Sequence, residues 1–167
     1  MPTEWTYPNT VIQYSEADVH IPWLNIEDNF DEINLVRTER DLVHIANSMM
    51  NDYKTKTYYL ICKEFDWKNL PEQIQGIELY VNVKRAGRIT DDTIQLHLMQ
   101  PLGNNLADYK IADLKVYGSE TELWGLETIT HEMLNDPEFG IVLRYQSHPT
   151  IPHKTAVYMN HIQMRVW

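Results

Sequence analysis

The segment Ile77–Arg85 alternates between apolar and more polar side chains along its length. A period of two residues is that of a β-strand with one buried face and one solvated face. The residues that would face the core are Ile77, Leu79, Val81 and Val83. The turn Ala86-Gly87-Arg88 follows, and the alternation resumes over Thr93–Met99 after Asp91-Asp92. This spacing predicts two successive strands, with the aspartates standing ahead of the second one.

Further strands are expected at Lys56–Lys63, Gly140–Tyr145 and Thr155–Trp167. In the last of these, Asn160-His161 interrupts the alternation, which predicts a β-bulge there. Thr38–Met50 fits the period of either a helix or a strand.

One short helix is predicted after Thr130, whose hydroxyl can cap the first turn. Glu132 and Met133 would lie in that first turn, and Asn135-Asp136-Pro137 would end the helix. Many short strands with turn residues between them, together with one helix, predict a mainly β fold. The expected form is an antiparallel β-sandwich of jelly-roll type, because nothing indicates a βαβ repeat.

The chain has 167 residues, a length that suits one domain with an extended arm. Residues 1–22 contain three prolines and scattered aromatics, and they show no clear period. We therefore expect an N-terminal arm (1–22) that orders against a neighbouring subunit, followed by a sandwich domain (23–167).

Acidic side chains outnumber basic ones by 24 to 14, which gives a net charge of -10. Such a charge opposes binding to the phosphates of nucleic acids and to anionic membranes. No Lys or Arg precedes Arg37, so the N-terminus lacks the basic region of a signal peptide or of a nucleic-acid-binding arm. The longest purely apolar run, Tyr58–Cys62, is far too short to span a bilayer.

The motifs that could support catalysis or metal binding are incomplete. A single cysteine, Cys62, excludes an internal disulfide, and its apolar context predicts a buried, inert thiol. His131-Glu132 begins like a zinc-protease helix, but Asn135 stands where the second histidine is required. The other histidines considered, which we expect in solvated loops rather than around a metal, are His148, His153 and His161.

Acidic residues form two clusters, which are Glu27, Asp28, Asp31 and Glu32, and the pair Asp91 and Asp92. Paired carboxylates could serve a glycosidase, or loop carboxylates could bind calcium. No EF-hand spacing is present, so we expect solvated loop acids and turn caps.

Aromatic residues are numerous, with ten Tyr, five Trp and three Phe. Tyrosine and tryptophan combine a large contact area with a polar group, which suits interfaces and sugar-binding surfaces alike. The interface candidates are Trp5, Tyr7, Tyr14 and Trp23. Trp124, within Leu123-Trp124-Gly125-Leu126, is expected in the core instead.

Short motifs follow one another in a characteristic order from Trp23 to the C-terminus. They are Trp23-Leu24-Asn25, Leu70–Ile77, Gly103–Ala107, Tyr117-Gly118, Leu123–Leu126, Asn135–Ile141 and the closing strand Ala156–Trp167. In order and spacing they resemble a domain of tailed-phage and prophage structural proteins. The resemblance covers residues 23–167 and implies a jelly-roll β-sandwich that serves in virions without catalysis. It also favours a strand at Leu42–Ala46.

We therefore expect a phage virion structural protein: a capsid decoration or cement protein, or a neck or tail component. It would contact other virion proteins, assemble as a homo-oligomer and need no cofactor or metal. A carbohydrate-binding module of a tail or surface protein, with exposed aromatics stacked on sugars, is the alternative. A glycosidase using the acid clusters is a third hypothesis, which we do not favour.

Overall fold

The computed structural model describes residues 1–16, 20–23, 36–40, 56–147 and 155–167. The strands are β1 (Pro8–Tyr14), β2 (Val36–Arg40), β3 (Tyr59–Phe65), β4 (Ile77–Ala86), β5 (Ile89–Leu98), β6 (Gln100–Leu102), β7 (Lys115–Gly118), β8 (Phe139–Ser147) and β9 (Thr155–Val166). The helix α2 spans His131–Asn135. Within the described residues, no helix has the length and apolar character needed to cross a membrane.

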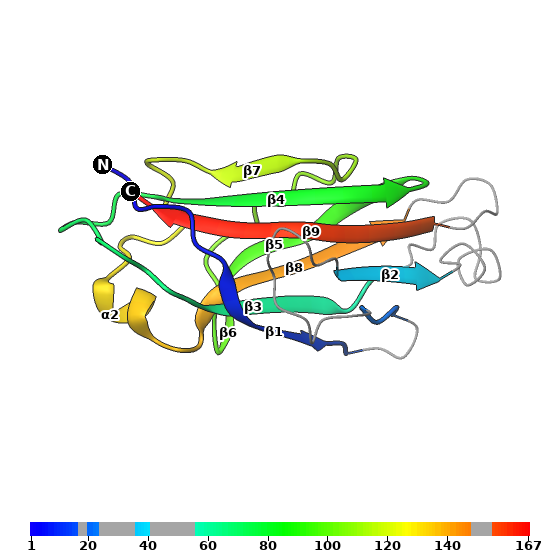
Figure 1. The fold of residues 1–167 in the computed structure, drawn as a ribbon, viewed down its shortest axis with the longest axis horizontal. Helices are drawn as coiled ribbons and strands as arrows, with labels where there is room; N and C mark the ends of the chain where they lie inside the picture. The colour runs from blue at the N-terminus through cyan, green and yellow to red at the C-terminus, as the bar shows by residue number, and fades with distance from the viewer. Residues whose placement is uncertain (17–19, 24–35, 41–55, 148–154) are drawn as a thin grey trace.

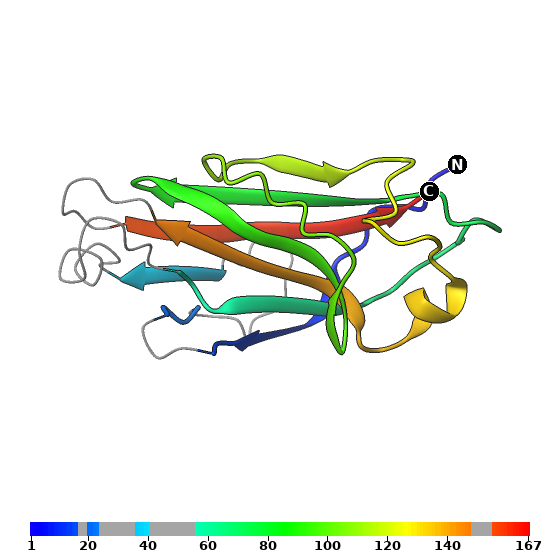
Figure 2. The same cartoon turned by 180° about the vertical axis from the view of Figure 1, so that it is seen from behind.

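The strands form two antiparallel sheets that pack as two layers (Figures 1 and 2). One sheet has five strands in the order β1-β3-β8-β5-β6, and the other has four in the order β2-β9-β4-β7. From β2 to β9, consecutive strands change sheet at every step except between β5 and β6. The prediction of a mainly β, antiparallel sandwich is confirmed, and the part of the chain that the structure describes has one short helix, as expected; the jelly-roll type stays a prediction.

The core lies between the sheets, and β4 contributes to it as its period predicts. Its apolar residues, Ile77, Leu79, Val81 and Val83, are all buried. On the opposite face, Lys84 is exposed but Glu78 is only partly so. The reason is that Glu78 accepts a hydrogen bond at 2.5 Å from the guanidinium of Arg165 on β9, which covers it.

Two local predictions are confirmed. In the pairing of β4 with β9, Asn82 lies opposite His161 and Val83 lies opposite Met159, so Asn160 is the extra residue of a bulge. The helix α2 begins after Thr130, whose hydroxyl accepts a hydrogen bond at 3.1 Å from the Met133 amide. Both features were encoded locally in the sequence.

Several predictions fall on residues outside the described part of the chain. They concern the acid cluster Glu27, Asp28, Asp31 and Glu32, the strand at Leu42–Ala46, and the histidines His148 and His153. These stay predictions.

Three of the short sequence motifs pack against one another, namely those that contain Ile77, Gly103-Asn104 and Trp124. Trp124 is fully buried, and its indole N–H donates to the carbonyl oxygen of Ile77 at 3.0 Å. The carbonyl of Trp124 in turn accepts from the Asn104 amide at 2.7 Å. Gly103 has φ +75°, and a Cβ there would lie 2.2 Å from that same carbonyl oxygen, so only glycine fits. These motifs fix the connections of the sandwich.

The described part of residues 1–22 is joined to both sheets of its own chain. The backbone of Thr6 pairs with Met164 of β9, and β1 pairs along β3. Farther on, Ile21 is buried, and its amide donates to the carbonyl of Lys56 at 2.9 Å. We expected this segment to order against a neighbour; instead, its described residues order against their own sandwich.

Candidate interaction surfaces

The four aromatic interface candidates have different surroundings. The Trp5 ring lies 4.5 Å from the Arg165 guanidinium carbon, and the Tyr7 ring packs edge-on against His161. Both rings are half-buried against β9 of the same chain. The side chain of Tyr14, at the end of the edge strand β1, is 55% exposed.

Trp23 is a core residue. It is 2% exposed, and its indole N–H donates at 2.9 Å to the carbonyl of Tyr58. Its ring also packs edge-on against Tyr145 of β8. A side chain enclosed in this way is not available to a partner, so we withdraw Trp23 from the interface candidates and keep the other three.

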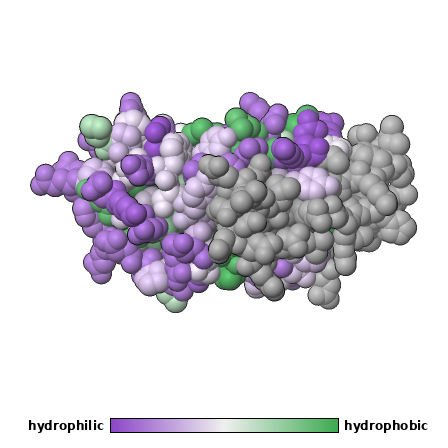
Figure 3. Space-filling view, in the orientation of Figure 1, coloured by the Kyte–Doolittle hydropathy of each residue, from purple (hydrophilic) through white to green (hydrophobic). Residues whose placement is uncertain are grey.

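An apolar surface that the aromatics did not indicate lies along β7 and the loop before it. We call it the edge patch; its members, with their exposed fractions, are Tyr109 (54%), Ile111 (41%), Leu114 (56%) and Val116 (53%). Among the described strands, β7 is the last in its sheet, so one backbone edge has no neighbouring strand. Figure 3 shows hydrophobic side chains along the upper side of the molecule, where β7 lies in Figure 1.

The pair Asp91 and Asp92, expected in a solvated turn, lies inside β5, and both residues are buried. The strand begins at Ile89, earlier than its alternation indicates, because a bulge between Asp91 and Thr93 shifts the pattern. The burial is possible because cationic side chains from other segments reach both carboxylates. The expectation of solvated acids is therefore corrected at these two positions.

Asp91 belongs to an inner cluster beneath the edge patch. Its carboxylate accepts a hydrogen bond from the Tyr117 hydroxyl and lies 3.6 Å from the ammonium of Lys115. Lys115 also pairs with Asp108 at 2.9 Å. Burial raises the pKa of Asp91 above its ordinary value, and the neighbouring Asp108 carboxylate adds to the rise. The Asp91 Oδ1 atom has no hydrogen-bond partner among the described residues.

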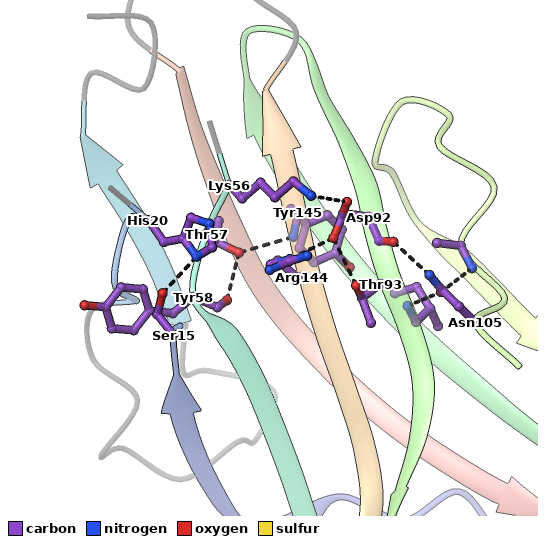
Figure 4. Close-up of polar contacts among 12 residues, drawn as sticks. Ser15, His20, Lys56, Thr57, Tyr58, Asp92, Thr93, Asn105, Arg144 and Tyr145 are labelled. Atoms are coloured by element: carbon purple, nitrogen blue, oxygen red, sulfur yellow. Dashed lines mark hydrogen bonds and ion pairs between the residues drawn. The ribbon is translucent and has the colours of Figure 1, made fainter. Parts of the chain in front are cut away.

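Asp92 belongs to an outer cluster (Figure 4). Its Oδ2 accepts from Arg144 Nε at 2.7 Å, and its Oδ1 lies 3.2 Å from the Lys56 ammonium. Burial alone would raise the pKa of Asp92, but Arg144 and Lys56 outweigh it and lower the pKa. Arg144 also pairs with Glu16 at 3.1 Å and lies 4.0 Å from the ring centre of Tyr59. The cluster is fully compensated in charge and links three strands with the segment after β1.

Cys62 is fully buried, as predicted, and burial raises the pKa of its thiol. His131, from the incomplete zinc motif, is exposed, and its Nε2 lies 2.6 Å from the carbonyl oxygen of Pro71. Among the described residues, no three or more His, Cys, Asp or Glu side chains gather in a way that could hold a metal ion.

Comparison of the chain with protein-family models, with curated proteins and with solved structures found no match. Its function must therefore be inferred from the residues and their arrangement.

Proposed function

We propose that the protein is a structural component of a tailed-phage virion that acts through protein–protein contacts rather than catalysis. The observation that carries this proposal is the shared packing of the motifs on which the phage resemblance rests. Trp124, in the connection from β7 to α2, meets Gly103 and Asn104, in the connection from β6 to β7. The resemblance therefore extends to residues that this fold requires, and the strand order from β2 to β9 supports a jelly roll.

The edge patch supplies a surface for such contacts. Its four apolar side chains are each more than two-fifths exposed, and they adjoin a strand that has no neighbour on one edge among the described strands. Exposed edges of this kind pair readily with a strand of another chain, and apolar side chains favour that association. The partner would be another virion protein or a second copy of this chain, in a capsid decoration, neck or tail position.

Of the acids considered for a glycosidase, the pair Asp91 and Asp92 fits a structural role better. Asp92 is held between Arg144 and Lys56, and Asp91 accepts from Tyr117 inside the sandwich. A general acid and a nucleophile must both face one substrate. These two carboxylates have separate sets of neighbours.

The proposal is tested by quantitative mass spectrometry of purified virions. We expect peptides of this protein at a fixed ratio to the major capsid protein. The number of copies per particle should be enough to form at least one complete symmetric ring or one set of capsomer positions. Absence from the particle, or less than one copy per particle, would overturn the proposal.

The edge patch is tested with the double variant Leu114→Ser/Val116→Ser. We expect the variant to keep its melting temperature, because exposed positions change stability little, and to lose incorporation into particles. Met99→Ser is the matched control, because Met99 is 77% exposed in the turn between β5 and β6 of the other sheet, and this variant should incorporate normally. Normal incorporation of the double variant would exclude the edge patch as the contact surface.

A further inference from the structure

A groove crosses the outer face of the five-stranded sheet, the face nearest the viewer in Figure 2. It receives side chains from β1, β3, β8, β5 and β6 and has a volume of about 610 Å³. Binding sites for small ligands commonly measure ~300–1,000 Å³. The groove lies on a different sheet from the edge patch, so what it binds is independent of the proposed virion contacts.

Two tyrosine rings form one wall of the groove. The rings of Tyr14 and Tyr59 are stacked, with centroids 6.4 Å apart and planes inclined by 15°. Tyr59 is held by the guanidinium of Arg144, 4.0 Å from its ring centre. Tyr14 is the more exposed of the pair, so its ring can pack against a flat apolar surface of a ligand.

The polar side chains of the groove have their charges compensated. Glu16 pairs with Arg144 at 3.1 Å, and Glu138 pairs with Lys63 at 3.0 Å. Both carboxylates keep solvent access, with exposed fractions of 51% and 41%. A carboxylate only accepts hydrogen bonds, and it has more acceptor positions than one cation fills. The free positions suit ligand hydroxyl groups.

His97 adds another polar group to the groove. It is 8% exposed, and its Nδ1 has no hydrogen-bond partner among the described residues. Burial lowers the pKa of His97, which favours the neutral imidazole. Together with the exposed Gln100, the groove offers donors and acceptors without an excess of positive charge.

We propose that this groove binds an uncharged oligosaccharide, with Tyr14 packed against a sugar ring and Glu16, Glu138 and Gln100 bonded to its hydroxyls. Charge excludes the obvious competitors. An anionic ligand such as a phosphate would meet two carboxylates and no unpaired cation in the described lining. A second copy of this chain, with a net charge of -10, would bring further acids against them.

The test is an array of neutral and acidic oligosaccharides probed with the labelled full-length chain, followed by calorimetric titration of each bound saccharide. We expect binding to at least one neutral saccharide and a loss of at least about fivefold in affinity for Tyr14→Ala. Tyr14→Phe should keep the affinity, because it retains the ring. Val116→Ser, in the edge patch, should bind as the wild type does, and melting curves should show all variants folded.

The binding measurements would overturn the proposal if the chain bound no saccharide on the array, bound only acidic saccharides, or had equal affinity as wild type and as Tyr14→Ala. A photo-crosslinker placed at Met99, on the rim of the groove, tests the alternative that the groove binds a protein. If it links the groove to a virion protein in assembled particles, the groove is a protein-docking site and not a glycan site.

Discussion

Asp91 and Asp92 are adjacent in the sequence, but they belong to two regions with different electrostatics. The inner cluster around Asp91 has a buried carboxylate with a raised pKa, and its cation, Lys115, is shared with Asp108. In the outer cluster, the pKa of the Asp92 carboxyl is lowered, and that carboxylate accepts a buried hydrogen bond from Arg144. Burial raises the pKa of both acids, so the difference comes from their neighbours. Arg144 and Lys56 outweigh burial at Asp92, whereas at Asp91 burial and the Asp108 carboxylate outweigh Tyr117 and Lys115.

The alternation of side chains along β5 produces this separation. Successive side chains of a strand point to opposite faces of the sheet, so Asp91 meets Tyr117 between the sheets and Asp92 meets Arg144 on the other face. In the bulge, Asp91 lies opposite Tyr145 and Thr93 lies opposite Arg144, so Asp92 is the extra residue. The inner cluster then supports β7, which carries the edge patch, and the outer cluster positions Arg144 beside the groove. Each candidate surface thus depends on one of the two acids.

The largest effect is expected from deleting residues 1–22, which removes contacts of the outer region and none of the contacts within the inner cluster. The deletion removes β1 from β3, the buried Ile21 from the core and Glu16 from Arg144. Burying a side chain of this size is worth ~1.5–3 kcal/mol by itself, so we expect the truncated chain to be unfolded or close to it. Urea denaturation followed by tryptophan fluorescence measures this; a stable, cooperative transition would show that the segment is a separable arm.

The next effect in size is expected from Arg144→Met, which leaves Asp92 buried without its principal cation. Removing one member of a buried ion pair typically costs ~3–5 kcal/mol. Lys115→Met is the matched variant in the inner cluster. It should cost far less, because Asp91, with its raised pKa, can take up a proton when the cation is lost. Equal losses in urea denaturation would mean that the two regions do not differ as described.

The sequence was sufficient for features encoded by near neighbours. The period of Ile77–Arg85 predicted β4 and its buried residues, and Thr130 predicted the start of α2. The Asn160-His161 interruption predicted the bulge in β9. In each case the determining residues lie within a few positions of the feature, so pattern and composition contain the necessary information.

The positions of the buried acids could not be predicted in the same way. Asp92 is buried because Lys56 and Arg144, both distant in the sequence, reach its carboxylate. One signal was available: Arg144 stands within the apolar strand Gly140–Tyr145, and a base in such a run indicates a buried acid partner. The exposure of Val116 could not be predicted for another reason: it depends on the position of β7 at the end of its sheet, which is set by the order of the strands.

The smallest effects are expected from the paired variants Asp92→Asn and Asp91→Asn. The two wild-type carboxylates should contribute to the free energy of unfolding with opposite pH dependence. The folded-state pKa of Asp92 is lowered, so its stabilisation is full above the ordinary value of 3.8 and is lost as the pH falls through the folded value. The folded-state pKa of Asp91 is raised, so its contribution is full below 3.8 and is lost as the pH rises through the folded value.

At pH 7 we therefore expect Asp92→Asn to lower the free energy of unfolding by ~1.5–3 kcal/mol, the usual worth of hydrogen bonds to a charged group. Asp91→Asn should leave that free energy unchanged or raise it, because asparagine can still accept from Tyr117 and carries no charge to bury. Melting temperatures measured from pH 3 to 8 test both slopes. The Asp91→Asn variant should lose the decline that the wild type shows on the alkaline side, and the Asp92→Asn variant should lose part of the decline at acid pH. Parallel curves for the two variants would show that the two carboxylates share one environment, and the distinction between the regions would fail.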